Sequence, residues 1–346
     1  MSELIEEDIG ILIGNLSKLE SKISGKTFLV SGGAGFLGSW LCEVLEAFNS
    51  RIICVDNMIS GSEINVSHLK KECFQLIPKD VSKFETDEKV DYIVHMACLA
   101  SPPLYQKHPI ETLDTSVLGT RNMLEIARRN DVEGFLFTST SEIYGDADVI
   151  PTPEDYWGNV NPIGPRSIYD EGKRVAETYC VSYFQKYGLP VKITRIFNTY
   201  GPRLDVKSTS QYGRVIVKFI SQALGGEPIT VYGDGSQTRS FCYITDLIEG
   251  LLKLLLKPNF SGEVVNLGND EETSILNLAK LIIKLSKSQS KIVFQPLPKD
   301  DPKRRKPDLS KAERLLGWEP KVNLDQGLTK TIRWFKESNR QRSTTI

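Results

Sequence analysis

The chain has 346 residues, 40% of them hydrophobic, and its 43 basic residues nearly balance its 44 acidic ones. This length allows about two domains with a substantial core, and the balanced charge gives no indication of a nucleic-acid or membrane surface. We expect a cytoplasmic protein, because no apolar run approaches the roughly 20 residues of a membrane span and the acidic start lacks the positive region of a signal peptide. The six cysteines have no metal or redox spacing, so a reduced protein without a bound metal is expected.

An apolar stripe runs through the first 24 residues, where large aliphatic side chains recur at spacings of three and four from Ile5 to Ile23. This spacing predicts an amphipathic helix over residues 1–25, packed on the main domain or on a partner subunit. Gly10 and Gly14 weaken the helix by roughly 1 kcal/mol each.

Residues 27–38 are the stretch around which the chain is organised. A β-branched and aromatic run predicts a buried parallel strand, and glycines at a Gly-x-x-Gly-x-x-Gly spacing lead from it into an apolar helix. Glycine lets the backbone turn tightly, and the helix N-terminus favours the charge of a pyrophosphate. The residues expected to contact a dinucleotide here are Gly32, Gly35, Phe36, Leu37 and Gly38.

The next predicted strand, residues 51–55, ends at Asp56, which follows Gly38 by 18 residues. This is close to where a ribose-binding carboxylate belongs in a dinucleotide fold, and Asn57 stands beside it. A carboxylate accepts both ribose hydroxyls but repels a 2′-phosphate, so the cofactor is predicted to be NAD rather than NADP.

Strands and helices alternate over residues 26–196, which predicts an α/β, Rossmann-like, doubly wound parallel sheet covered on both faces. Further strands are predicted at residues 73–77, 91–95, 134–138 and 191–196, and helices near residues 109–129 and 169–187. Because ligands lie at the carboxyl ends of such strands, Asp80, Val81, Ala97 and Ala100 are expected to contact the cofactor.

Beyond residue 197 the pattern loosens into loops, and residues 197–337 are predicted to form a smaller, loop-rich substrate domain over the mouth of the sheet. Some of its segments are expected to return to the sheet. A short strand is expected at residues 229–232, with helices near residues 213–224, 245–256, 275–286 and 308–316. The polar tail, residues 338–346, is predicted to be disordered.

Tyr169 and Lys173 lie one turn apart on the same face of a predicted helix. An ammonium group favours a neighbouring phenolate, and the positive nicotinamide adds to this, so Tyr169 becomes a candidate general base for an alcohol. The strand before residues 138–145 places hydroxyls and a carboxylate at its carboxyl end, where the substrate should lie.

Several sequence blocks, in this order, resemble the extended short-chain dehydrogenase/reductases that act on nucleotide sugars, and within them the UDP-glucuronate decarboxylases. The resemblance covers nearly everything from residue 26 to 336. The blocks are residues 32–38, 139–145, 154–158, 161–166, 169–177, 195–203, 235–239 and 305–308.

The resemblance implies a role for each residue of the catalytic group. Thr140 holds the sugar hydroxyl, Tyr169 removes its proton, and Lys173 binds the nicotinamide ribose and lowers the pKa of Tyr169. Carbon 4 then gives a hydride to NAD, and the resulting ketone is β to the carbon-6 carboxylate, so carbon dioxide is lost. Returning the hydride would give UDP-xylose.

The resemblance also assigns the surroundings of the sugar. Ser141 and Glu142 correspond to an acid/base pair near carbon 5, and Arg305 to the cation that faces the carboxylate. The remaining contacts to the nucleotide sugar and the cofactor are carried over to Asn198, Thr199, Arg214, Tyr232, Gln237 and Arg239. The helices near residues 109–129 and 169–187 carry apolar residues on more than one face, and the family pairs them as a four-helix bundle, so a homodimer is expected.

Three alternatives stay open at this point. A nucleotide-sugar 4,6-dehydratase needs an acid beside the leaving hydroxyl, and here a serine, Ser141, follows Thr140. A 4-epimerase shares the oxidation step, and a non-catalytic NAD-binding protein would have no reason to keep the catalytic group together. The chain also departs from the family at Cys98, Glu111 and Ser116, which leaves the identity of the sugar open.

Overall fold

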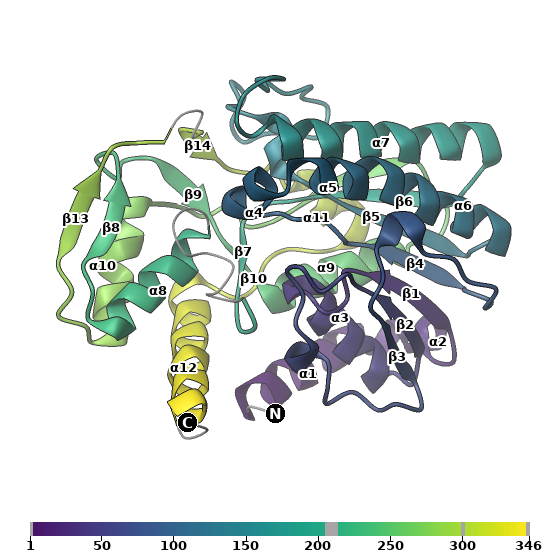
Figure 1. The fold of residues 1–346 in the computed structure, drawn as a ribbon, viewed down its shortest axis with the longest axis horizontal. Helices are drawn as coiled ribbons and strands as arrows, with labels where there is room; N and C mark the ends of the chain where they lie inside the picture. Colours follow the sequence, from purple (N-terminus) through teal and green to yellow (C-terminus); the bar gives the residue numbers. More distant parts are fainter. Residues whose placement is uncertain (1–2, 205–213, 299–301, 344–346) are drawn as a thin grey trace.

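The fold is known from a computed structural model, which describes residues 3–204, 214–298 and 302–343 (Figure 1). A seven-stranded sheet lies at its centre, with the strand order β11-β6-β5-β4-β1-β2-β3 and every neighbouring pair parallel. The strands are β1 (Thr27–Ser31), β2 (Arg51–Val55), β3 (Phe74–Ile77), β4 (Tyr92–His95), β5 (Gly134–Thr140), β6 (Val191–Ile196) and β11 (Glu263–Leu267). The predicted doubly wound α/β sheet is confirmed.

The inner strands of the sheet are largely buried because both faces of the sheet are covered. Every residue of β4 and β5 is buried. Successive side chains point to opposite faces of a strand, so Leu29 joins the hydrophobic core on one face while Phe28 and Val30 join the core on the other.

Two layers of helices enclose the sheet (Figure 1). One layer consists of α4 (Pro102–Lys107), α5 (Pro109–Asp114), α6 (Thr120–Asn130) and α7 (Ser167–Tyr187). The other consists of α1 (Glu3–Leu16), α2 (Glu20–Ile23), α3 (Phe36–Ala47), α9 (Ile244–Leu255) and α11 (Ser310–Leu316). Three elements that follow residue 197 in the chain, α9, β11 and α11, thus lie in or against the central sheet.

The N-terminal helix packs on its own chain. α1 contacts α3 and α9, and its stripe residues Ile5, Ile9 and Leu12 are buried there. The buried carboxylate of Asp8 accepts a hydrogen bond from the Tyr243 hydroxyl at 2.7 Å and forms an ion pair with Lys330. These contacts fix the helix against two later segments of the chain.

A second lobe lies beside the sheet, where Figure 1 shows α8 and α10 next to β8 and β13. Its helices are α8 (Val215–Gly225), α10 (Ile275–Ser286) and α12 (Leu324–Ser343). Its strands are β7 (Thr199–Tyr200), β8 (Ile229–Tyr232), β9 (Thr238–Ser240), β10 (Cys242–Tyr243), β12 (Glu272–Ser274), β13 (Ile292–Gln295) and β14 (Arg304–Arg305).

Two segments differ from the sequence-based expectation. The single helix predicted near residues 109–129 is interrupted by a π-helical turn, η4 (Thr115–Gly119), which brings Thr115 to the central pocket. The tail predicted to be disordered from residue 338 continues as helix through Ser343, because α12 packs on α8 and α10 and buries Phe335. Residues 344–346 lie outside the described residues, as does Gly213 at the start of a predicted helix.

Within the described ranges, no helix combines the length and the apolar character needed to cross a bilayer.

The glycine turn after β1 yields a prediction on stability. A Cβ on Gly38 would lie 2.6 Å from the Cα of Gly33 and closer still to the carbonyl oxygen of Gly32, both backbone atoms. Gly38→Ala should therefore destabilise the protein by roughly 1–3 kcal/mol. Gly10→Ala is the matched control, since a Cβ on Gly10 would have no atom of the described residues within 4 Å and alanine should stabilise helix α1 by roughly 1 kcal/mol. Thermal unfolding of both variants tests this, and equal midpoints would contradict the close packing at Gly38.

Candidate active site

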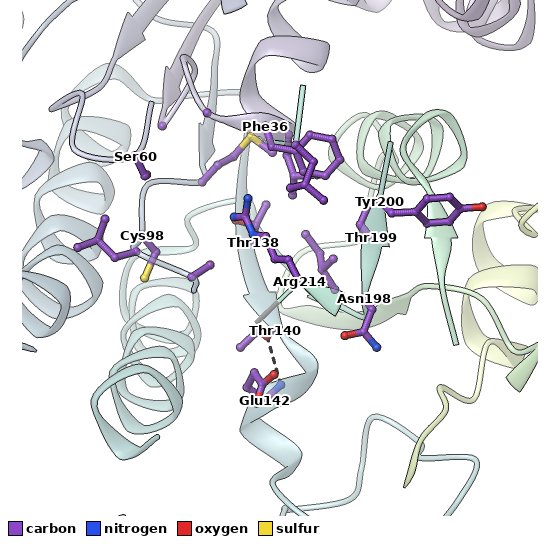
Figure 2. A pocket seen from close by; sticks show the side chains of 18 of the residues that line it. Phe36, Ser60, Cys98, Thr138, Thr140, Glu142, Asn198, Thr199, Tyr200 and Arg214 are labelled. Carbon is purple, nitrogen blue, oxygen red and sulfur yellow. Dashed lines mark hydrogen bonds between the residues drawn. The ribbon is translucent and has the colours of Figure 1, made fainter. Parts of the chain in front are cut away.

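A pocket of about 820 Å³ runs along the carboxyl ends of the central strands. Figure 2 looks across it, with Phe36 at one end, Glu142 at the other, and Cys98 and Asn198 on opposite walls. This is the edge at which open α/β sheets bind their ligands. Every residue that the sequence proposed for the site lines this pocket, except Asp80.

The glycine turn forms one end of the pocket. Gly32 has a φ of +72°, and a Cβ there would lie 2.9 Å from the backbone of Ala97 on the neighbouring strand end. Helix α3 begins at Phe36, and its first N–H groups have no partners within the helix. Phe36 and Leu37 line the pocket, so this backbone fits the pyrophosphate of NAD.

Asp56 follows β2 at the same end of the pocket. Its buried carboxylate accepts hydrogen bonds from the backbone N–H groups of Ala34 at 3.1 Å and Met58 at 2.9 Å. Burial raises the pKa of the Asp56 carboxyl, and the two N–H groups oppose that rise. A Cβ on Gly61 would lie 2.6 Å from the carboxylate, so the loop packs closely against it. The position fits an adenosine ribose, and Asn57 lines the pocket beside it.

Asp80 caps a helix and does not contribute its side chain to the pocket. Its side chain caps the short helix η3 (Val81–Lys83) by accepting hydrogen bonds from the Ser82 N–H at 2.8 Å and the Ser82 hydroxyl at 2.6 Å. Asp80 does not line the pocket, whereas Val81 does. The structure therefore places a capping carboxylate where the sequence suggested a cofactor contact.

Tyr169 and Lys173 occupy the first turns of α7, and both are buried. The Tyr169 ring stacks on Tyr105 with ring centroids 5.6 Å apart, and the Lys173 ammonium donates to the Thr138 carbonyl at 2.7 Å. Burial raises the pKa of Tyr169 well above its usual value, against an opposing hydrogen bond with Thr140, and burial lowers the pKa of Lys173. Burial is thus the largest influence on the pKa of both side chains.

Glu142 lies at the other end of the pocket. It follows β5 in the short helix η5 (Ser141–Tyr144), and its backbone N–H donates to the Thr140 hydroxyl at 3.2 Å, as Figure 2 shows. Its carboxylate pairs with both terminal nitrogens of Arg305, one at 3.0 Å, and with Arg166. The two guanidinium groups hold the pKa of Glu142 far below its usual range. Glu142 is thus ionised in this arrangement.

Arg166 lines the pocket but was not predicted from the sequence as a site residue. It directly precedes α7, and its carbonyl accepts hydrogen bonds from the N–H groups of Tyr169 and Asp170 at 3.1 Å each. Its place three residues before Tyr169, on the same helical face, was a signal that could have identified it.

Asp170 was also missed. Its side chain is 4% exposed, and Oδ1 has no hydrogen-bond partner in the described part of the chain. Burial and the charge of Glu142 raise the pKa of Asp170 to about 8, and Arg166 and Arg305 oppose this shift. At neutral pH Asp170 is therefore largely protonated.

The wall opposite Cys98 comes from the second lobe and from the ends of the strands that lead into it. The Asn198 amide donates to the Ser240 carbonyl at 3.3 Å, and the Gln237 amide donates to the Tyr232 carbonyl at 2.8 Å. The other proposed residues on this side are Thr199, Arg214, Tyr232 and Arg239. Lys218, which the sequence did not single out, also lines the pocket and donates to the Tyr232 hydroxyl at 3.1 Å.

The structure accounts for the three departures from the family pattern. Cys98 and Ser116 meet each other, with sulfur and oxygen 3.4 Å apart, so two of the changed positions form one contact. Glu111 is exposed on α5 and does not line the pocket. The departure at Glu111 therefore lies outside the pocket wall.

Comparison with known proteins agrees with this site. Residues 28–268 match the model of the NAD dependent epimerase/dehydratase family, and the chain belongs to this family. The family resemblance seen in the sequence and NAD as the cofactor are thereby confirmed.

Individual relatives within this family are similar to the chain over most of its length. The chain is 48% identical to UDP-glucuronic acid decarboxylase 1 of Danio rerio over 97% of its length and 82% of the relative's. It is also 48% identical to UDP-glucuronic acid decarboxylase 2 of Arabidopsis thaliana, over 94% of this chain and 71% of that one. Among solved structures, UDP-glucuronic acid 4-epimerase of Bacillus cereus, in complex with UDP-glucuronic acid and NAD, is 30% identical, with a TM-score of 0.80 and coverage of 90% and 99% of the two chains.

Asp170 gives a prediction on pH dependence. Because its pKa is raised in the folded protein from 3.8 to about 8, the protonated carboxyl contributes stability that is complete below about pH 4 and is lost as the pH rises through 8. The thermal midpoint of the wild type should therefore fall more steeply between pH 6 and 9 than that of Asp170→Asn. Exposed Asp155→Asn is the control and should follow the wild type. Parallel curves for wild type and Asp170→Asn would contradict the assignment.

Proposed function

We propose that this protein is a UDP-glucuronate decarboxylase that makes UDP-xylose with NAD as its cofactor. One observation supports this most directly: Thr140, Tyr169 and Lys173 share a pocket with a buried arginine, Arg305, at the sugar end. The first three suit oxidation of an alcohol, and the guanidinium suits a carboxylate on the same sugar. The relatives named as UDP-glucuronic acid decarboxylases agree with this assignment.

In the first step Tyr169 removes the proton of the carbon-4 hydroxyl while Thr140 holds that hydroxyl. Lys173 lies buried one turn further along α7, where its charge favours the phenolate and its donors suit a ribose. NAD, when bound, accepts the hydride from carbon 4 and later returns it. The proton on Tyr169 goes back to the carbon-4 oxygen in that last step, so neither Tyr169 nor the cofactor is consumed.

The second step breaks the bond between carbons 5 and 6. The carbon-4 ketone is β to the carboxylate, so the electron pair of that bond can move into an enolate as carbon dioxide leaves. Arg305 faces the carboxylate and the developing negative charge. Glu142, with Ser141 beside it, provides the proton for carbon 5.

The nucleotide lies along the wall formed by the second lobe. Arg214 and Arg239 suit the diphosphate, because a guanidinium group binds phosphate oxygens in a bidentate manner. Asn198, Tyr232 and Gln237 line the same wall and complete the proposed contacts to the nucleotide.

A second candidate function is 4-epimerisation of the same sugar acid. The observation that favours it is the Bacillus cereus neighbour, which is a UDP-glucuronic acid 4-epimerase in complex with UDP-glucuronic acid. The two reactions share the oxidation step and differ in the fate of carbon 6, so release of carbon dioxide separates them.

The function is tested by offering the NAD-loaded protein UDP-glucuronate and, separately, UDP-glucose and dTDP-glucose. Carbon dioxide and UDP-xylose should form from UDP-glucuronate alone. Tyr169→Phe should lower the rate by about a hundredfold or more while NAD stays bound, since only the phenolic oxygen is lost. Tyr187→Phe, at the exposed end of α7, is the matched control. A UDP-linked galacturonate would identify an epimerase, and a 4-keto-6-deoxy sugar a dehydratase.

We also propose a homodimer that pairs the layer containing α5 and α7. Exposed apolar side chains lie along it: Ile110 is 64% exposed, Leu118 47% and Val175 42%. Figure 1 shows α5 beside α7 on the outside of the sheet. Pairing two copies through these helices would cover the apolar side chains of both.

Charge at this surface should separate the subunits. Wild-type protein at micromolar concentration should have twice the mass of one chain by light scattering, and Leu118→Asp with Val175→Asp should have the mass of one. Phe294→Asp, on exposed strand β13 of the second lobe, should remain dimeric. A monomeric wild type would contradict the proposal.

A further inference from the structure

The carboxylate of Glu142 occupies a site made by two arginines at the sugar end of the pocket. Arg305 contacts it through both terminal nitrogens, and Arg166 contacts it through one. All three side chains line the pocket, and none is more than 18% exposed. A carboxylate of the protein therefore sits where two partly dry guanidinium groups converge, which is an environment suited to the carboxylate of a sugar acid.

The charge of this cluster leaves room for a second anion. Arg166 and Arg305 carry two positive charges, and Glu142 carries one negative charge. Asp170, the remaining acidic group that is buried beside them, pairs with neither arginine in the described residues. With Asp170 protonated the cluster has a net charge of +1, which an incoming carboxylate would neutralise.

We propose that Arg166, together with Arg305, binds the carboxylate of the substrate, and that Glu142 holds both guanidinium groups until the substrate takes over Arg166. The inference rests on the proposed function and adds a substrate-binding residue to it. Arg166 is the residue that changes partner, because it donates one hydrogen bond to Glu142 whereas Arg305 donates two.

The position of Arg166 supports this role. It directly precedes α7, and its guanidinium group pairs with Glu142, whose backbone N–H donates to Thr140, the residue proposed to hold the carbon-4 hydroxyl. Carbon 6 is two bonds from carbon 4 in the sugar, so one helix end can serve both atoms. The positive end of the α7 dipole adds to the attraction for an anion there.

The exchange explains how Glu142 can supply a proton. While paired with two arginines its carboxylate cannot hold one. When Arg166 turns to the substrate and Arg305 is shared between Glu142 and the substrate carboxylate, less positive charge faces Glu142, which can then bind a proton from solvent. This proton passes to carbon 5 as the carbon–carbon bond breaks, and the electron pair of the broken bond forms the new carbon–hydrogen bond. After carbon dioxide leaves, Arg166 pairs with Glu142 again. UDP-xylose has no carboxylate that Arg166 could bind, so the product is released.

The test compares binding of UDP-glucuronate with binding of UDP-xylose, which differs only by the carboxylate, in NAD-loaded protein by calorimetry. All proteins compared, the wild-type reference included, carry Tyr169→Phe in addition, so that UDP-glucuronate is bound but not converted. Arg166→Gln should weaken UDP-glucuronate binding by about tenfold or more, the loss expected for a hydrogen bond to a charged group, and leave UDP-xylose binding within twofold of wild type. Arg304→Gln, an exposed neighbour of Arg305 that pairs with Glu272, is the control and should change neither. Equal weakening for both ligands would mean a structural role for Arg166 and would overturn the proposal.

Glu142→Gln tests the exchange without touching Arg166. The neutral amide competes less for the guanidinium groups, so UDP-glucuronate should bind more tightly than in wild type while carbon dioxide release is lost. Unchanged or weaker UDP-glucuronate binding would refute the competition. Wild type that binds UDP-glucuronate selectively through Arg166 but releases no carbon dioxide would leave this inference standing and remove the proposed decarboxylase function.

Discussion

The ion pairs of Glu142 join three parts of the chain that are distant in sequence. Glu142 follows central strand β5, Arg166 precedes α7, and Arg305 lies in β14, which pairs with β9 beside Arg239. The cluster thereby ties the sheet edge where the oxidation takes place to the wall proposed to hold the nucleotide. The desolvation free energy of a buried carboxylate exceeds the attraction of one weak partner, and the two guanidinium groups here offset it. The relative placement of the two halves of the pocket depends on this charge balance.

Helix α7 concentrates the chemistry, because Arg166 is its N-cap residue and its first two turns present Tyr169, Asp170 and Lys173. Their spacing of three and four residues places them along one face. A second buried ion pair holds the helix further along. Glu177 accepts from Arg195 at 2.8 Å and from the Ser139 hydroxyl at 2.5 Å, which fixes α7 to β6 and β5. Packing at this second point limits how far the catalytic face can shift.

Local signals were enough to predict most of the sheet and the glycine turn, since strand periodicity and glycine spacing are properties of neighbouring residues. Asp80 was misplaced because an aspartate after a strand suits a helix cap as well as a ligand. Arg166 and Asp170 were missed because their environment depends on Arg305, which approaches only in the folded chain. The continuation of α12 past residue 338 likewise depends on burial of Phe335 and not on its polar sequence.

The two steps of the proposed reaction place related demands on the charges around Tyr169. The negative charges of Glu142 and Asp170 both raise the pKa of Tyr169, in addition to its burial, and so oppose formation of the phenolate. The structure limits both effects. Glu142 is neutralised by arginines, and Asp170, whose Oδ1 has no hydrogen-bond partner among the described residues, is largely protonated at neutral pH. The arrangement that gives the sugar end of the pocket a net positive charge for a carboxylate therefore also limits the rise in the pKa of Tyr169, the proposed base. An acidic group added beside Tyr169 would weaken substrate binding and oxidation together, because both depend on one local field.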